Sequence, residues 1–195
     1  DARLARFAPP APTALVDATA WWNEQAWTAL PVRRHERAPA RRWPLDVQVG
    51  GPLAPLQARL ATQGWRAQPQ AGWTAALGLL DPQRAPASEP VLPATLDAQA
   101  EALLLRRPGP VPGTLQVLRL WRAPARLGDG HALWLGSTQT LEFHRPLGAF
   151  GVWMPREDGG AAHAALRTAL GGDARESAHP VEGVTVLRVR SEALR

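Results

Sequence analysis

The run TLQVLRLWRAPARLGDGHALWLGS, residues 114–137, is the stretch that decides the fold. Two apolar segments, residues 114–121 and 132–135, flank a polar region that contains Gly128-Asp129-Gly130. The apolar side chains fall on both faces of an extended chain, which is typical of a strand covered on both sides. The Gly-Asp-Gly sequence tolerates the left-handed backbone of a tight turn. The pattern predicts a β-hairpin at the centre of a sheet, with a bulge at residues 123–127.

The sequence on either side of this hairpin mixes strands and helices. Strands are predicted at residues 45–49, 65–68, 101–107, 138–145 and 184–190, and helices at residues 13–27, 73–80, 161–170 and between Pro52 and Gly64. Because these elements do not alternate regularly, they predict an α+β fold with a mixed, mainly antiparallel sheet and a few packed helices. Residues 1–12 are rich in Pro and Ala and are expected to be a linker, followed by a single domain at 13–195.

The composition excludes several kinds of chemistry. The 195 residues contain no cysteine, so disulfides, thiolate catalysis and zinc–sulfur sites are ruled out. No apolar run reaches about 18 residues, so no segment is predicted to cross a bilayer. Nine tryptophans either fill a core or lie at an apolar–polar boundary, and the buried state is predicted for Trp121 and Trp134.

The net charge of +5 is carried by arginine, because lysine is absent. GC-rich coding bias is the favoured explanation, and an arginine surface for phosphate groups is the functional alternative. The segment PVRRHERAPARRW, residues 31–43, concentrates this charge. Its candidate ligand-binding residues are Arg33, Arg34, Arg37, Arg41 and Arg42. They are interpreted as a surface for anionic lipid or, alternatively, as a solvated loop. Nucleic-acid binding is not predicted, because no recognised binding motif accompanies the charge.

Acid–base and metal chemistry have weak signals. The five histidines lack metal-ligand spacing, so a metal site would need residues from distant segments, and neither a metal nor a cofactor is predicted. Asp97 and Glu101 are four residues apart, which would place them on one face of a helix as an acid–base pair. The favoured alternative is that they are solvated or pair with arginine. Asp129 is interpreted as a turn residue, and Asp46 is expected to face water.

Two further motifs are interpreted as structural. Gly50-Gly51 before a helix can present free amides to a phosphate, but the P-loop pattern is absent. A structural turn is therefore favoured. No serine lies in a Gly-x-Ser-x-Gly nucleophile elbow.

The chain resembles the C-terminal domain of the LssY family over most of its length. The similarity is carried by Trp21-Trp22 with Trp27, by LPVRR at 30–34, PLDVQVGGPLAPLQARLATQGW at 44–65, VLP at 91–93, EALLLRR at 101–107, VLRLW at 117–121 and LWLGS at 133–137. This chain departs from the family pattern at residues 96–99, where Leu-Asp-Ala-Gln replaces a His-Asp-Gly-Arg segment and retains only Asp97. It departs again at residues 47–51, where Val-Gln-Val-Gly-Gly replaces Leu-Gln-Trp-Ala-Gly.

The resemblance implies a context for the chain. In that family the domain typically follows a membrane-embedded phosphatidic-acid-phosphatase-type domain, often with a DedA-type domain, so a transmembrane segment is expected upstream of Asp1. The phosphatase motifs Lys-x6-Arg-Pro, Pro-Ser-Gly-His and Ser-Arg-x5-His-x3-Asp do not occur in this chain. The implied chemistry, dephosphorylation of a lipid phosphate or diphosphate, is therefore expected outside it.

The function predicted is that of a non-catalytic accessory domain of a bacterial membrane-bound lipid phosphatase, of the phosphatidic acid or undecaprenyl diphosphate type. It would bind a lipid headgroup or an envelope partner. The alternative is an independent hydrolase that uses Asp97 with a spatially assembled histidine. The expected location is the bacterial inner membrane with this domain on the periplasmic face, although the arginine cluster argues for the cytoplasmic face through the positive-inside tendency.

Overall fold

A computed structural model describes residues 14–35, 42–68, 89–145, 151–157 and 159–194. Its strands are β1 (Ala14–Val16), β2 (Arg33–His35), β3 (Arg42–Pro44), β4 (Val47–Gly50), β5 (Arg66–Ala67), β6 (Thr95–Leu96), β7 (Gln99–Ala100), β8 (Leu103–Pro108), β9 (Thr114–Leu127), β10 (Ala132–His144), β11 (Val152–Arg156), β12 (Ala174–Ala178) and β13 (Thr185–Arg190). Its helices are α1 (Ala18–Asn23), α2 (Leu53–Ala61) and α4 (Ala161–Leu170), and short 3-10 turns are η2 (Ala26–Ala29), η5 (Gly171–Asp173) and η6 (Ser191–Ala193).

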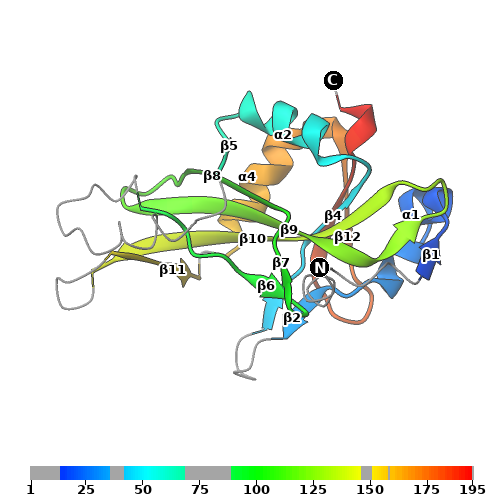
Figure 1. Cartoon of the computed structure of the whole chain (residues 1–195), viewed down its shortest axis with the longest axis horizontal. Coiled ribbons are helices and arrows are strands. Elements are labelled where there is room, and N and C mark those ends of the chain that lie inside the picture. Colours follow the sequence, from blue (N-terminus) through cyan, green and yellow to red (C-terminus); the bar gives the residue numbers. More distant parts are fainter. Residues whose placement is uncertain (1–13, 36–41, 69–88, 146–150, 158, 195) are drawn as a thin grey trace, which may run out of the picture.

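The predicted hairpin is confirmed and lies at the centre of the main sheet. β9 and β10 pair antiparallel, and the strand order is β12-β13-β4-β10-β9-β8-β5 (Figure 1). The bulge is also present, because Ala132 faces Arg126 while Trp134 faces Arg122. β9 therefore places more residues than β10 in this interval, which includes Pro124, a residue without a backbone N–H to donate.

The sheet is mainly antiparallel, as predicted. Among the described strands, only β1 with β9 and β13 with β4 pair in parallel. The fold is broadly α+β but contains more strand than helix. The predicted strands at 45–49, 65–68, 101–107 and 184–190 correspond to β4, β5, β8 and β13, and the segment 138–145 is the second half of β10.

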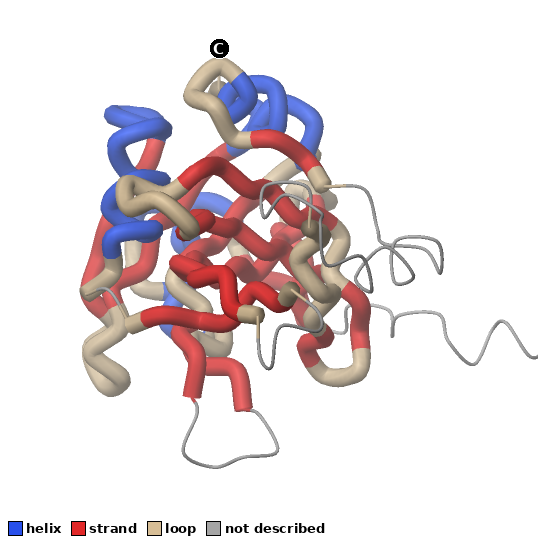
Figure 2. The backbone as a smooth tube through the Cα atoms, turned by 90° about the vertical axis from the view of Figure 1, so that its left-hand side faces the viewer, coloured by secondary structure: helices blue, strands red, loops and turns tan. Residues whose placement is uncertain are grey.

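Helices and loops cover both faces of the sheet, in agreement with the two-sided apolar pattern of the hairpin. α2 and α4 lie together on one face (Figure 1), where Leu56, Leu60, Leu166 and Leu170 pack with strand residues such as Leu118. On the opposite face, Trp21 of α1 and Trp27 of η2 join Trp121, Leu133 and Leu135. Figure 2, turned by 90°, shows helices (blue) grouped above and to one side of the strands (red). A smaller cluster, which includes Val117, Leu141 and Trp153, extends the core toward β11.

Two helix predictions have different outcomes. The helix at 161–170 matches α4, and its end at Gly171 is as expected. The helix predicted at 13–27 is confirmed only in part, because the short α1 and η2 lie within this segment but its beginning forms β1. The side chain of Asp17 caps α1 by accepting a hydrogen bond from the backbone N–H of Ala20 at 2.7 Å. The helix therefore begins after Asp17, and residues 14–16 pair with β9 instead. The predicted linker at 1–12 and helix at 73–80 lie outside the described residues.

The two tryptophans predicted to be buried differ. Trp121 is fully buried, and its indole N–H donates to the carbonyl of Ala94 at 3.2 Å. Trp134 is only partly buried, and the guanidinium of Arg122 lies over its ring, 4.9 Å from the ring centroid. Its indole N–H donates to the carbonyl of Gly51 at 2.9 Å.

The Gly50-Gly51 pair forms a structural turn. Gly51 has a φ of +104° and donates its N–H to the carbonyl of Ala132 at 2.8 Å. A Cβ on Gly50 would lie 2.9 Å from the ring of Trp21, so only glycine allows this close packing. The Gly51 amide that a phosphate would need is thus already used.

None of the helices in the described ranges combines the length and the apolar character needed to cross a membrane.

Candidate functional site

The candidate site lies where the partner of β10 changes. β4 pairs with residues 133–136 of β10, and β11 pairs with residues 140–144. Between these two ladders, the side chain of Asp46 takes the place of a partner strand. Its Oδ1 accepts from the backbone N–H of Thr138 at 2.8 Å, and its Oδ2 accepts from the Thr138 hydroxyl. Residues 138–141 of β10, which lie at this change of partner, contribute to the two pockets described below.

Asp46 also begins a chain of charged groups that reaches the surface. Its Oδ2 lies 3.0 Å from Nδ1 of His163 on α4, and the other ring nitrogen of His163 lies 3.2 Å from Oε1 of Glu176 on β12. Arg167, one helical turn after His163, donates to Oε2 of Glu176 at 2.9 Å. We call these four residues, Asp46, His163, Glu176 and Arg167, the charged clamp. Asp46 is 5% exposed, so the expectation that it faces water is wrong.

The charges of the clamp determine its protonation. Burial by itself lowers the pKa of His163, but the hydrogen bonds and charges of Asp46 and Glu176 outweigh it and raise the pKa above its usual value. Slight burial raises the pKa of Glu176, but Arg167 and His163 outweigh this effect and lower it. Each ring nitrogen of His163 faces a carboxylate, so the ring donates at both nitrogens when it is doubly protonated. In that form neither ring nitrogen can accept a proton from a substrate, and the clamp acts as a structural network.

Two pockets lie beside residues 138–141 of β10. The first has a volume of about 300 Å³, and its lining includes Arg34, Arg119, Trp43, Trp153 and Gln139. The second has a volume of about 230 Å³ and lies toward the start of α4, with Asp46, Thr138, Thr140 and Arg156 in its lining. Trp43 and Gln139 contribute to both. The first pocket combines two guanidinium groups with two indole rings, and we call it the arginine pocket.

The two arginines of the arginine pocket are held in different ways. Arg119 is 5% exposed, and it donates to Oε2 of Glu101 at 2.5 Å and to the carbonyl of Leu92 at 3.0 Å. Arg34, from β2, places its guanidinium 5.6 Å from the centroid of the Trp121 ring. Burial and stacking restrict both side chains, so little entropy is lost when they bind an anion.

The candidate arginines of the sequence are separated by the structure. Arg34 lines the arginine pocket, whereas Arg33 turns away and forms an ion pair with Glu182 at 2.8 Å. Arg42 lies in β3, but its side chain is outside the described part of the structure, as are residues 37 and 41 entirely.

Asp97 has a structural position. It lies in the turn between β6 and β7 with a φ of +48°, next to Ala98 with a φ of +63°. Both values fall in the left-handed region, which Asp tolerates better than most residues. Its side chain is exposed, and among the described residues none forms a hydrogen bond or ion pair with its carboxylate. Glu101, its predicted helical neighbour, instead pairs with Arg119.

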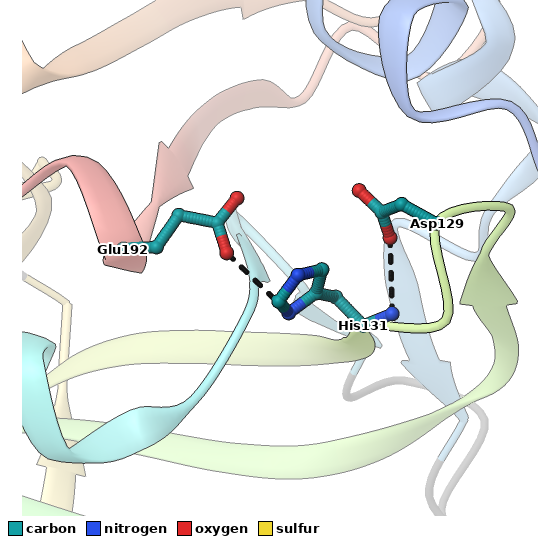
Figure 3. A group of neighbouring side chains, drawn as sticks. All are labelled: Asp129, His131 and Glu192. Atoms are coloured by element: carbon teal, nitrogen blue, oxygen red, sulfur yellow. Dashed lines mark hydrogen bonds and ion pairs between the residues drawn. The ribbon is translucent and has the colours of Figure 1, made fainter.

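A separate group of ionisable side chains lies at the end of the hairpin. Asp129 and His131 belong to the β9–β10 turn, and Glu192 belongs to η6, so two distant segments meet here (Figure 3). Among the described residues, this is the group of three whose donor atoms are close enough to hold a metal ion.

Sequence reasoning identified some of these residues and missed others. The ion pair of Glu101 with Arg119 agrees with the favoured alternative that this carboxylate pairs with an arginine. Arg119 itself was missed, and its only signal is an arginine within an otherwise apolar strand. His163 gives no signal, because its partners are 117 and 13 residues away. The Asp-x-His spacing of 129 and 131 is visible in the sequence, but the third member of that group is not.

Comparison with known proteins gives the family. No curated protein and no solved structure was found to match the chain. A family model described as "LssY C-terminus" matches residues 27–143. This match covers more than half of the chain and extends from η2 almost to the end of β10, so it includes Arg34, Asp46 and Arg119 but not His163. The resemblance noted in the sequence is thereby confirmed: the chain belongs to the LssY C-terminus family.

Proposed function

We propose that this chain is a non-catalytic binding domain of a bacterial membrane-bound lipid phosphatase, and that it binds the phosphate of a lipid headgroup in the arginine pocket. The observation that carries the proposal is the presence of two guanidinium groups, from Arg34 and Arg119, in one pocket with tryptophan walls. Guanidinium groups bind phosphate oxygens through paired hydrogen bonds, and a desolvated site strengthens such contacts.

The size and polarity of the pocket support a small anionic group. A volume of about 300 Å³ is at the lower end of the range for small-molecule sites. Trp43 and Trp153 supply rings at the wall, and such rings are suited to the boundary between a polar headgroup and apolar chains. Arg119 is already fixed by Glu101, so it contributes donors in a set position rather than a mobile charge.

The hydrogen bonds that Asp46 and His163 already make within the protein support binding rather than catalysis. A general base needs a nitrogen or oxygen that can accept a proton from the substrate. In the charged clamp, His163 faces a carboxylate on each side and Asp46 receives three donors. Asp97, the candidate of the hydrolase alternative, is an exposed turn residue.

The membrane context and location belong to the same proposal. Family membership supports them, and the expected transmembrane segment upstream of Asp1 would place the domain on the periplasmic face of the inner membrane. A fusion of alkaline phosphatase to the end of the full-length protein tests this, because that reporter is active only outside the cytoplasm. An inactive fusion, together with an active cytoplasmic reporter, would place the domain on the other face.

The binding proposal is tested by vesicle flotation. The purified chain is mixed with phosphatidylcholine vesicles and with phosphatidylcholine vesicles that contain phosphatidic acid. Binding is expected only with phosphatidic acid, and Arg34→Gln should weaken it about tenfold or more, because a hydrogen bond to a charged group contributes about 1.5–3 kcal/mol.

The matched control is Arg126→Gln. Arg126 is exposed and lies seven residues beyond Arg119 on β9, about 20 Å along the strand. The Arg126→Gln substitution lowers the net charge by the same amount as Arg34→Gln, so non-specific attraction to anionic vesicles falls equally in both variants. Equal losses in the two variants, or equal binding to both kinds of vesicle, would contradict a specific site at Arg34.

A further inference from the structure

Three potential metal ligands converge beside the β9–β10 turn. They are a carboxylate oxygen of Asp129, Nδ1 of His131 and a carboxylate oxygen of Glu192, and these atoms all lie within 4.8 Å of one another. Figure 3 shows the three side chains turned toward a common space between the turn and η6. Nδ1 of His131 lies 3.4 Å from Oε2 of Glu192.

The spacing of these atoms is close to that of a bound ion. Zinc lies 2.0–2.2 Å from nitrogen and oxygen ligands, so tetrahedral ligands are about 3.5 Å from one another. The three donor atoms are at most 4.8 Å from one another, so each needs to move by about 1 Å or less to reach this spacing. The three side chains are exposed, so small torsional changes supply this movement without repacking the core.

The backbone holds the ligands in place on both sides. The N–H of His131 donates to Oδ1 of Asp129 at 3.0 Å, which fixes the Asp129 side chain across the turn. Leu127 N donates to the carbonyl of His131 at 3.0 Å and so anchors the end of the hairpin. On the other side, the Ser191 hydroxyl donates to the carbonyl of Gly50 at 3.0 Å, which places Glu192 over the Gly50-Gly51 turn.

We propose that Asp129, His131 and Glu192 bind a divalent transition-metal ion of the zinc type. Two carboxylates bring two negative charges, which a divalent cation neutralises, and the imidazole favours a borderline ion such as Zn²⁺ over Mg²⁺ or Ca²⁺. Three protein ligands leave at least one coordination position to water. Because Glu192 lies in the last turn of the described chain, the bound ion ties this segment to the central hairpin.

Titration of the metal-free chain with ZnCl₂ in a calorimeter tests the site. One saturable site per chain is expected, with no comparable binding of MgCl₂. His131→Ala and Glu192→Gln should each weaken it at least about tenfold, because even the loss of an outer-shell partner costs 10–100-fold. Zinc should also slow amide hydrogen exchange in η6, a readout that does not depend on calorimetry.

The chain offers a matched control in the His144–Glu142 pair. The side chains of His144 and Glu142 are 49% and 42% exposed and lie 3.8 Å apart, compared with 45% and 43% for His131 and Glu192. No third ligand is grouped with this pair among the described residues. His144→Ala should therefore leave zinc binding unchanged. The absence of saturable zinc binding, equal losses in the His131 and His144 variants, or equal binding of Mg²⁺ would each overturn the proposal.

Discussion

The charged clamp predicts how the stability of this domain depends on pH. In His163→Ala, Asp46 keeps its two contacts from Thr138 but loses its charged donor. The Asp46 side chain is only 7% exposed, so water cannot readily replace that donor. Glu176 is 31% exposed and still holds Arg167, so its loss is small. The variant is therefore expected to lose about 2–3 kcal/mol of unfolding free energy near pH 6, the contribution of one hydrogen bond between charged groups.

The size of this loss should fall as the pH rises. The pKa of His163 is raised in the folded protein, so its stabilising contribution is complete below the ordinary value of about 6.5 and is lost as the pH rises through the folded value. Above that value a neutral His163 still donates one hydrogen bond to Asp46, which contributes about 1 kcal/mol. The difference between wild type and His163→Ala should thus shrink from about 2–3 to about 1 kcal/mol.

Urea unfolding followed by circular dichroism between pH 5.5 and pH 9 measures this difference. The range lies above the usual pKa of glutamate, so Glu176 does not titrate within it. His144→Ala serves as the control, because His144 is exposed and lies 3.8 Å from a single exposed carboxylate, so its substitution should cost less stability than His163→Ala. A constant difference between wild type and His163→Ala, or one that grows with pH, would refute the assignment of a raised pKa to His163.

Three further substitutions test the core and the arginine pocket. Trp121→Ala removes a fully buried ring and is expected to lower the unfolding free energy by about 3–5 kcal/mol in urea titrations; a loss below about 1 kcal/mol would contradict its central position. Arg119→Met removes the buried ion pair with the carboxylate of Glu101, and a loss of about 3–5 kcal/mol is expected. If the Glu101→Gln, Arg119→Met double variant is no more stable than Arg119→Met, the buried charge of Glu101 is not the cause. Thr140→Val should be neutral or stabilise by about 1–2 kcal/mol in thermal denaturation, because its buried hydroxyl has no hydrogen-bond partner within the described part of the chain; a clear destabilisation would show that the hydroxyl is bonded in solution.

The elements that could be predicted have local causes. The two-sided apolar run and the Gly-Asp-Gly turn specify β9 and β10, and the apolar spacing between Gly160 and Gly171 specifies α4. The helix predicted at 13–27 does not extend over residues 14–16, because a tertiary contact competes with local propensity. Residues 14–16 gain backbone hydrogen bonds to residues 125–127 of β9, beyond Leu120, where the pairing of β9 with β8 ends.

The candidate sites were predicted only in part, because the relevant contacts join distant segments. The sequence indicated an arginine cluster, but its partners decide the role of each member: Glu182 neutralises Arg33, whereas Arg34 lies over Trp121 beside the arginine pocket. No spacing rule links Asp46 to His163.

By itself, the sequence determined the central hairpin, the mainly antiparallel sheet, the α4 helix, the family and the exclusion of cysteine chemistry. These follow from side-chain periodicity, turn residues and composition, which act over a few residues. Only the tertiary structure decided that β10 changes partner at Thr138, that Arg34 and Arg119 share a pocket, and that Asp129, His131 and Glu192 meet. The physical reason is that burial, charge pairing and ligand geometry depend on distances in space, which chain folding fixes between segments far apart in sequence.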